Sequence, residues 1–265
     1  MSFSFARALA VVWKDLLDLR KNKGMLYSML ALPAVIVVMP IGVVATYVAR
    51  PDDPNLKLMA QYYDLTVNAE NATRFLVEKV LNDWFVLYLV MPVFVPILIS
   101  SHAVAGEKEK RTLEPLLASP ITALELVVGK SLASLIPSVI ICLIAFVALC
   151  IGVDVVAWPL THSPVLPNTM WTFGVIVISP LFAFFGNGVA VLISARVGDS
   201  RQAQQFAGLF VLPLVGLAAG QFGGFLKAGL GYYGLIAGIV LALDVVILLA
   251  AQRLFDRERL MSRWG

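Results

Sequence analysis

Charged residues are scarce in this chain. Only 14% of its 265 residues are Asp, Glu, Lys or Arg, whereas soluble domains carry about 25%. Hydrophobic residues make up 60%, and the mean hydropathy is +0.87. A soluble fold of this length cannot hide so much apolar surface from water. The sequence therefore predicts an all-α integral membrane protein, because its apolar runs reach the length that spans a bilayer as a helix.

Histidine and cysteine are also scarce, with two of each. His102 and His162 fall on opposite sides of the predicted membrane, which excludes a paired-histidine site within one chain. Cys142 and Cys150 share one apolar run, where thiols are typical packing residues rather than a disulfide framework. The sequence shows no pairing of a nucleophile with a base. We therefore expect no catalytic residue, no metal site and no enzymatic activity on this chain.

Long apolar runs, in contrast, are frequent. Hydropathy and length predict six transmembrane helices, and their approximate bounds are 26–48, 85–105, 131–152, 171–194, 206–226 and 229–251. Residues 25–253 then form one transmembrane domain, and residues 254–265 form a tail. Small residues at four-residue spacing, such as Gly216 with Gly220 and Gly234 with Gly238, indicate sites where helices can pack closely within the chain or across a dimer.

Residues 1–24 have the pattern of an amphipathic helix. Its predicted apolar face carries Phe5, Leu9, Val12, Trp13 and Leu16, and its polar face carries Arg7, Lys14, Asp18 and Lys21. A basic amphipathic helix that precedes a span typically lies along the inner leaflet. We expect an interfacial helix here.

The distribution of Lys and Arg predicts the orientation. With six spans both termini lie on one side, and that side receives fifteen of the 20 basic residues; the other side has only Arg50, Lys57, Arg74, Lys79 and Lys227. Positive charge concentrates on the cytoplasmic side of membrane proteins. The prediction is a multi-pass protein of the cell inner membrane with both termini in the cytoplasm.

The segment between the second and third spans is the most charged part of the chain. In "GEKEKRTLEPLLASP", residues 106–120, six of fifteen residues are charged, and leucines add an apolar stripe. Pro115 and Pro120 divide the segment into short pieces. A merely solvated loop needs no such stripe, so residues 106–130 are interpreted as a cytoplasmic docking surface for a soluble partner.

This segment resembles the cytoplasmic signature of the type-2 ABC exporter permeases. The matching positions are Gly106, Glu107, Glu109, Thr112, Leu113, Glu114, Leu116, Leu117, Pro120, Gly129 and Lys130. Arg111 departs from the pattern, because a glycine commonly precedes the threonine. The loop "SARVGDSRQAQQ", residues 194–205, is also similar to the family's loop between the fourth and fifth spans.

The resemblance implies a function and partners. It implies a permease subunit of an ATP-driven exporter, whose coupling helix between spans 2 and 3 receives motion from a separate cytoplasmic ABC ATPase. It further implies two ATPase copies and a second permease subunit in a homodimer or heterodimer, with ATP and magnesium bound by the ATPase and no cofactor on this chain. The residues expected to contact the ATPase are Gly106, Glu107, Glu109, Arg111, Thr112, Leu113, Glu114, Leu116, Leu117 and Pro120.

Gly129-Lys130-Ser131 superficially resembles a phosphate-binding loop. The full motif requires a glycine five residues before Gly129, and that position is Leu124. The interpretation of Lys130 is instead that it marks the cytoplasmic end of the third span.

Three polar residues lie at membrane depth. Asp244 is an intramembrane acid, which points to an ion or proton path or to a hydrogen bond with a neighbouring helix. Asn187 and Gln221 are interpreted as interhelical hydrogen-bonding groups. Two alternatives stay open: an ion-coupled carrier that acts alone with Asp244 as its titrating group, and a membrane assembly or accessory module that moves no cargo, because its docking loop and helix bundle would look the same in sequence.

Overall fold

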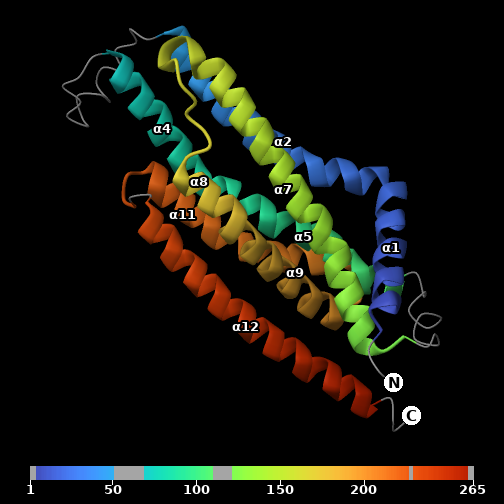
Figure 1. Cartoon of the computed structure of the whole chain (residues 1–265). Coiled ribbons are helices and arrows are strands. Elements are labelled where there is room, and N and C mark those ends of the chain that lie inside the picture. Colours follow the sequence, from blue (N-terminus) through green and yellow to red (C-terminus); the bar gives the residue numbers. More distant parts are fainter. Residues whose placement is uncertain (1–3, 51–68, 110–120, 227–228, 262–265) are drawn as a thin grey trace.

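The structure is a computed structural model that describes residues 4–50, 69–109, 121–226 and 229–261. Within these ranges the chain is helical apart from short turns and the segment that follows Thr161. Figure 1 shows long helices packed side by side along a common direction. The predicted all-α fold is confirmed for the described part of the chain.

The helices follow the predicted order. They are α1 (Phe5–Lys21), α2 (Lys23–Ala49), α4 (Ala69–Tyr88), α5 (Val90–Glu109), α7 (Ala123–Thr161), α8 (Thr169–Phe173), η1 (Gly174–Ile178), α9 (Ser179–Arg196), α10 (Ser200–Gly208), η2 (Leu209–Val211), α11 (Leu212–Phe222) and α12 (Leu230–Met261). Six helices or helix runs among them are long and apolar enough to span a membrane. The predicted number of spans is confirmed.

Several helices extend beyond their predicted spans. The second span is preceded by a helix that begins at Ala69, and Leu89 separates α4 from α5. The break follows from Pro92, which has no N–H to donate to the preceding turn. The helix of the third span continues to Thr161 rather than ending near residue 152, and His162 closes it in the left-handed conformation (φ 45°).

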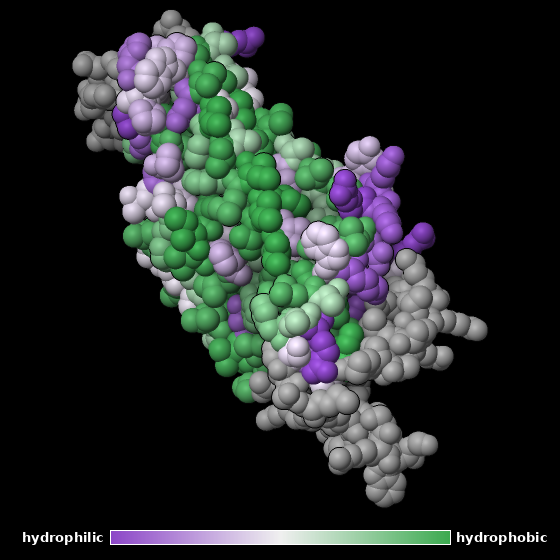
Figure 2. Space-filling view, turned by 45° about the vertical axis from the view of Figure 1, so that its right-hand side comes forward, coloured by the Kyte–Doolittle hydropathy of each residue, from purple (hydrophilic) through white to green (hydrophobic). Residues whose placement is uncertain are grey.

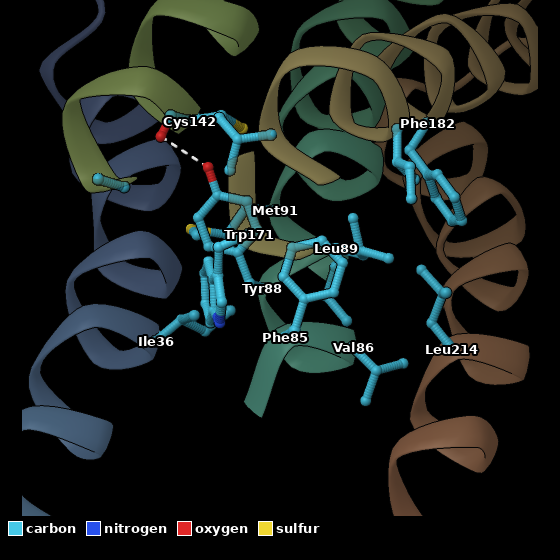
Figure 3. Close-up of a cluster of buried hydrophobic side chains, with 14 of the residues drawn as sticks. Ile36, Phe85, Val86, Tyr88, Leu89, Met91, Cys142, Trp171, Phe182 and Leu214 are labelled. Carbon is cyan, nitrogen blue, oxygen red and sulfur yellow. Dashed lines mark hydrogen bonds between the residues drawn. The ribbon is translucent and has the colours of Figure 1, made fainter. Parts of the chain in front are cut away.

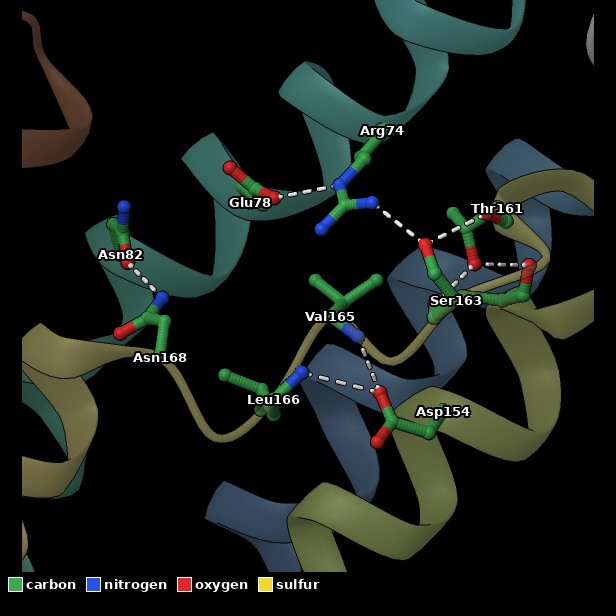
Figure 4. A network of polar contacts seen from close by, with 10 residues as sticks. Arg74, Glu78, Asn82, Asp154, Thr161, Ser163, Val165, Leu166 and Asn168 are labelled. Atoms are coloured by element: carbon green, nitrogen blue, oxygen red, sulfur yellow. Dashed lines mark hydrogen bonds and ion pairs between the residues drawn. The ribbon is translucent and has the colours of Figure 1, made fainter.

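The segment after α7 folds back onto that helix. The Asp154 carboxylate accepts hydrogen bonds from the backbone N–H groups of Val165 (2.8 Å) and Leu166 (3.1 Å). Arg74 on α4 donates to the Ser163 hydroxyl (2.6 Å) and to Glu78 (3.0 Å). Figure 4 shows this network joining α4, α7 and the following segment. The polar contacts hold together one end of the bundle.

The start of α1 and the end of α12 lie at the opposite end of the bundle. Figure 1 shows both near the first turns of α7, far from the end where α7 stops and α4 starts. Figure 2 shows a broad hydrophobic band with hydrophilic residues gathered toward the two ends. This distribution fits a bilayer around the middle of the molecule. We call the end with the termini the terminal end, and the other the loop end.

An aromatic cluster fills the core in the loop half of the bundle. Phe85 makes edge contacts with Trp171 (4.9 Å between centroids) and Tyr233 (4.8 Å), and Tyr88 lies 5.2 Å from Trp171. The Tyr88 hydroxyl donates to the carbonyl of Cys142 (2.8 Å), as drawn in Figure 3. These rings join α4, α7, α8 and α12, and they leave no room for a side chain at Gly174, where a Cβ would lie 1.8 Å from Phe85 Cζ.

Candidate coupling site and intramembrane polar residues

The predicted ATPase-coupling segment is only partly within the described residues. Gly106, Glu107 and Glu109 lie in the last turns of α5, at the terminal end of the bundle. The remaining members of the predicted set fall outside the described residues: Arg111, Thr112, Leu113, Glu114, Leu116, Leu117 and Pro120. The structure therefore describes the helix that leads into this segment and the helix that follows it.

On the C-terminal side of the coupling segment, the chain is held by the first turn of α7. Thr122 is the N-cap, and its hydroxyl accepts from the backbone N–H of Glu125 (3.3 Å). In return the Glu125 carboxylate accepts from the backbone N–H of Thr122 (2.8 Å). This reciprocal pair is a capping box, which satisfies two N–H groups that the start of a helix otherwise leaves unpaired. It fixes the point at which the chain leaves the coupling segment and enters the third span.

The same carboxylate fastens α7 to α1. Glu125 Oε1 accepts from the backbone N–H of Ser4 (2.6 Å) and from the Arg7 guanidinium (2.8 Å to Nη2 and 3.1 Å to Nε). Glu125 itself is fully buried. A buried carboxylate is tolerated when a charged partner and further donors compensate it, as they do here. We call Ser4, Arg7, Thr122 and Glu125 the α1–α7 latch.

A second contact joins the two helices further along. A Cβ on Gly129 would lie 2.7 Å from Val11 Cβ and 2.8 Å from the Ala8 carbonyl oxygen, so α1 approaches the α7 backbone directly. Lys130 is buried, and its Nζ lies 3.6 Å from Asp15 Oδ2. Gly129 and Lys130 therefore serve helix packing in this structure.

The α1–α7 latch was not predicted from the sequence, although one part of it has a recognisable sequence pattern. Thr122-x-x-Glu125 is the pattern of a capping box before an apolar run. Nothing in the sequence pairs Glu125 with Arg7, which lies 118 positions away. That pairing depends on α1 lying across the start of α7.

The exposed surface of α1 is apolar along one line. Phe5, Leu9, Trp13 and Leu17 recur every fourth residue, and each is exposed, from 38% at Leu17 to 67% at Trp13. The opposite side, formed by Ala8, Val11 and Val12, is buried. Val12 thus lies on the protein-facing side rather than on the predicted apolar face, while Phe5, Leu9 and Trp13 stay together.

Asn187 lies at the meeting point of three spans. Its Oδ1 accepts from the hydroxyls of Ser100 on α5 (2.7 Å) and Ser134 on α7 (2.6 Å), and all three residues are buried. Beside it, a Cβ on Gly186 would lie 2.4 Å from the Val93 carbonyl oxygen, so α5 and α9 are in close contact. Asn187 therefore cross-links α5, α7 and α9 inside the bundle.

Gln221 occupies a similar position near the loop end. Its side-chain amide exchanges hydrogen bonds with the Tyr233 hydroxyl (3.1 and 3.2 Å) and donates to the Asn82 carbonyl (3.4 Å). These bonds tie α11 to α12 and to α4. Both Asn187 and Gln221 thus bond across helices, whereas a Cβ added at Gly216, Gly234 or Gly238 would meet nothing within 4 Å in this chain.

Asp244 differs from the other two. It lies on α12 and is only 3% exposed. Neither of its carboxylate oxygens has a hydrogen-bond partner among the described residues. The described residues also contain no group of three or more His, Cys, Asp or Glu side chains able to hold a metal ion.

Together, the bundle of six apolar helices and its polar ends define a multi-pass membrane protein. The family model described as ABC-2 family transporter protein matches residues 9–233, which include the coupling segment and five complete spans. The chain therefore belongs to the ABC-2 family of transporter proteins, and it is a permease subunit of an ABC transporter, a family that implies a partner ATPase subunit. No curated protein matches the chain significantly.

Proposed function

We propose that this permease subunit forms the translocation pathway of an exporter, and that a partner ATPase drives it through residues 106–130. The charged and leucine-bearing sequence of that segment supports the proposal, because a docking surface at the membrane face needs both charge for water and apolar side chains for contact. In this proposal ATP and magnesium are bound on the partner and not on this chain.

The α1–α7 latch is the observation that carries the coupling mechanism. Residues 110–120 lie between the end of α5 and the start of α7. The first turn of α7 is fixed to α1 by an ion pair between the buried Glu125 and the partly exposed Arg7. A force on the docking segment therefore displaces a rigid corner made of two helices rather than a single loop. Because α7 then crosses the whole bundle to Thr161, the displacement reaches the loop end of the molecule.

The proposal extends to the assembly and its orientation. Two ATPase copies and a second permease subunit, identical or similar to this one, complete the transporter. The protein resides in the inner membrane, and its terminal end lies in the cytoplasm. The orientation is supported by the sequence, which assigns most of the Lys and Arg residues to that side. The exposed apolar line of α1 then rests in the inner leaflet.

One observation favours a second candidate, an ion-coupled carrier that acts alone. Asp244 is a buried intramembrane acid, the type of residue that carriers use to bind protons or cations. Carriers of this type usually place several polar groups around such an acid, and here no described residue donates to it. The ATPase-driven exporter is therefore the better supported function.

The decisive experiment isolates the intact protein from its native cells in mild detergent and identifies the chains that co-purify. We expect a soluble ATPase in stoichiometric amount. The double substitution Leu116→Glu with Leu117→Glu should remove most of that ATPase while the permease still inserts, because charged side chains cannot occupy an apolar contact. The matched control is Leu116→Met with Leu117→Met, which keeps the surface apolar and should retain the ATPase.

Two results would count against the proposal. A wild-type protein that purifies alone as a single species would favour the carrier. Full ATPase recovery with the glutamate double variant would show that the contact lies elsewhere on the terminal end.

A further inference from the structure

Asp244 lies in a seam between two helices. One turn further along α12, Ile247 packs against α9 so closely that a Cβ on Gly188 would lie 2.5 Å from Ile247 Cγ2. Asp244 is buried on the same side of the helix, three residues before this contact. The close approach at Gly188 therefore seals the seam beside the acid.

This seam is the main attachment of α12 to the rest of the chain. Helix α9 is the principal helix packed against α12, and Figure 1 shows α12 at the edge of the bundle. The other sides of α12 are exposed along most of its length; the exposed side chains include Leu235, Ile239, Leu243, Val246 and Leu249. A helix held along one side can separate from its neighbour without disrupting the core formed by the other spans.

Neither helix carries a Lys or Arg within seven residues of the seam at Asp244 and Gly188. On α12 between residues 230 and 251, the other titratable groups are Tyr232 and Tyr233, eleven or more residues away, or about 16 Å along a helix. On α9 the only charged residue is Arg196, eight residues beyond Gly188, or about 12 Å. An ionised Asp244 in the closed seam would thus be a buried charge without a counter-ion, and such groups take up a proton instead.

We propose that Asp244 is a proton-binding site controlled by the α9–α12 seam. While the seam is closed, the side chain is a neutral carboxylic acid. When α12 moves away from α9, water reaches the carboxyl, and the proton leaves the oxygen to become a hydronium ion in that water. The site would therefore couple protonation to the position of α12. This proposal holds with or without an ATPase partner, since it concerns a seam within this chain.

Infrared spectroscopy of the purified protein in lipid nanodiscs tests the closed state. A protonated carboxyl has a carbonyl stretching band that a carboxylate lacks, and the wild-type minus Asp244→Asn difference spectrum isolates the band of this residue. We expect the band at pH 7, where an ordinary aspartate, ionised above about pH 4, contributes none. Its absence at pH 7 with an intact fold would overturn the proposal.

A wedge substitution tests the link to the seam. Gly188→Leu places a large side chain where even a Cβ collides with Ile247, so it should separate α12 from α9. The Asp244 band at pH 7 should then shrink or vanish. The matched control is Gly216→Leu, because a Cβ at Gly216 meets nothing within 4 Å, and its spectrum should equal that of the wild type.

The outcome of the wedge experiment is read only for variants that remain monodisperse and helical. A full band in Gly188→Leu would show that protonation does not depend on the seam and would refute the coupling. If that variant fails to fold, the milder Gly188→Ala gives the same comparison with a smaller expected loss.

Discussion

Glu125 shows how one side chain can serve two structural purposes. One of its oxygens closes the capping box of α7, and the other holds the first turn of α1. Because the residue is fully buried, its charge depends on these donors. The capping pattern could be predicted from local sequence, whereas the partner Arg7 could not, since it depends on the tertiary position of α1.

The residue-scale prediction concerns this latch. Glu125→Gln should free the first turns of α1, because an amide cannot compensate the Arg7 guanidinium. Limited trypsin digestion of the purified protein should then cleave α1 at Lys14, Arg20 and Lys21 several-fold faster. Arg7→Met removes the same ion pair and should have the same effect, and the double variant should show little further change, since both changes break one interaction.

The control for this prediction is Glu78→Gln. It breaks an ion pair with Arg74 whose side chains are 42% and 39% exposed, and solvent-exposed pairs contribute about 0–1 kcal/mol. Digestion of α1 should remain at the wild-type rate. Equal cleavage rates in Glu125→Gln and wild type would mean that α1 is held by packing alone.

Asn187, Gln221 and Asp244 mark the limit of residue-scale prediction. Polar residues inside apolar runs could be recognised from the sequence, and so could their tendency to bond across helices. Their partners could not: Ser100, Ser134 and Tyr233 are common residue types with no distinguishing pattern. The lack of a described partner for Asp244 is likewise visible only in three dimensions.

At the scale of elements, the number and order of the spans could be predicted, but not all of their ends. Hydropathy responds to the apolar stretch, whereas the helix ends depend on caps and prolines. The helix of the third span continues through Asp154 because the following segment folds back and satisfies that carboxylate. Close packing was equally hard to locate: it occurs at Gly129, Gly186 and Gly188 rather than at the regularly spaced Gly216, Gly234 and Gly238.

The element-scale prediction uses two glycines. Gly129→Ala adds a Cβ that collides with Val11 and with the Ala8 backbone, so α1 must move away from α7. Overpacking of this kind costs about 1–3 kcal/mol, and we expect the midpoint of thermal unfolding in nanodiscs to fall by several degrees. Gly42→Ala is the control, because its Cβ meets nothing within 4 Å and removing a helical glycine stabilises by about 0.5–1 kcal/mol. A midpoint for Gly129→Ala equal to or above that of Gly42→Ala would contradict the close α1–α7 contact.

At the scale of the whole molecule, the two ends of the bundle differ in charge. The terminal end holds the start of α1, the last turns of α5 and the first turns of α7. The sequence assigns fifteen of the 20 basic residues to this side. An even number of spans returns the chain to its starting side. Hydropathy alone could therefore predict that the coupling segment lies on the same side as both termini. Which end faces the cytoplasm depends on the membrane and stays a prediction.

The whole-molecule prediction tests that orientation. In a background with Cys142 and Cys150 changed to alanine, Thr169→Cys places a thiol where the segment from the loop end enters the fourth span. Gly198→Cys places one in the connection between α9 and α10 at the terminal end, and both positions are exposed. In intact spheroplasts a membrane-impermeant maleimide should label Thr169→Cys alone. Gly198→Cys should react only after permeabilisation. The reverse labelling pattern would contradict the proposed topology, because the terminal end with its ATPase contact would then lie outside the cytoplasm.

The latch also has a practical consequence for handling this protein. The backbone N–H of Ser4 donates to a buried carboxylate, so the chain from Ser4 onward is part of the folded structure. Deleting residues 1–7 would remove three of the four hydrogen bonds that Glu125 receives from Ser4, Arg7 and Thr122. Affinity tags and fluorescent fusions are therefore better attached after α12. An N-terminal fusion can purify well and still have a weakened α1–α7 latch.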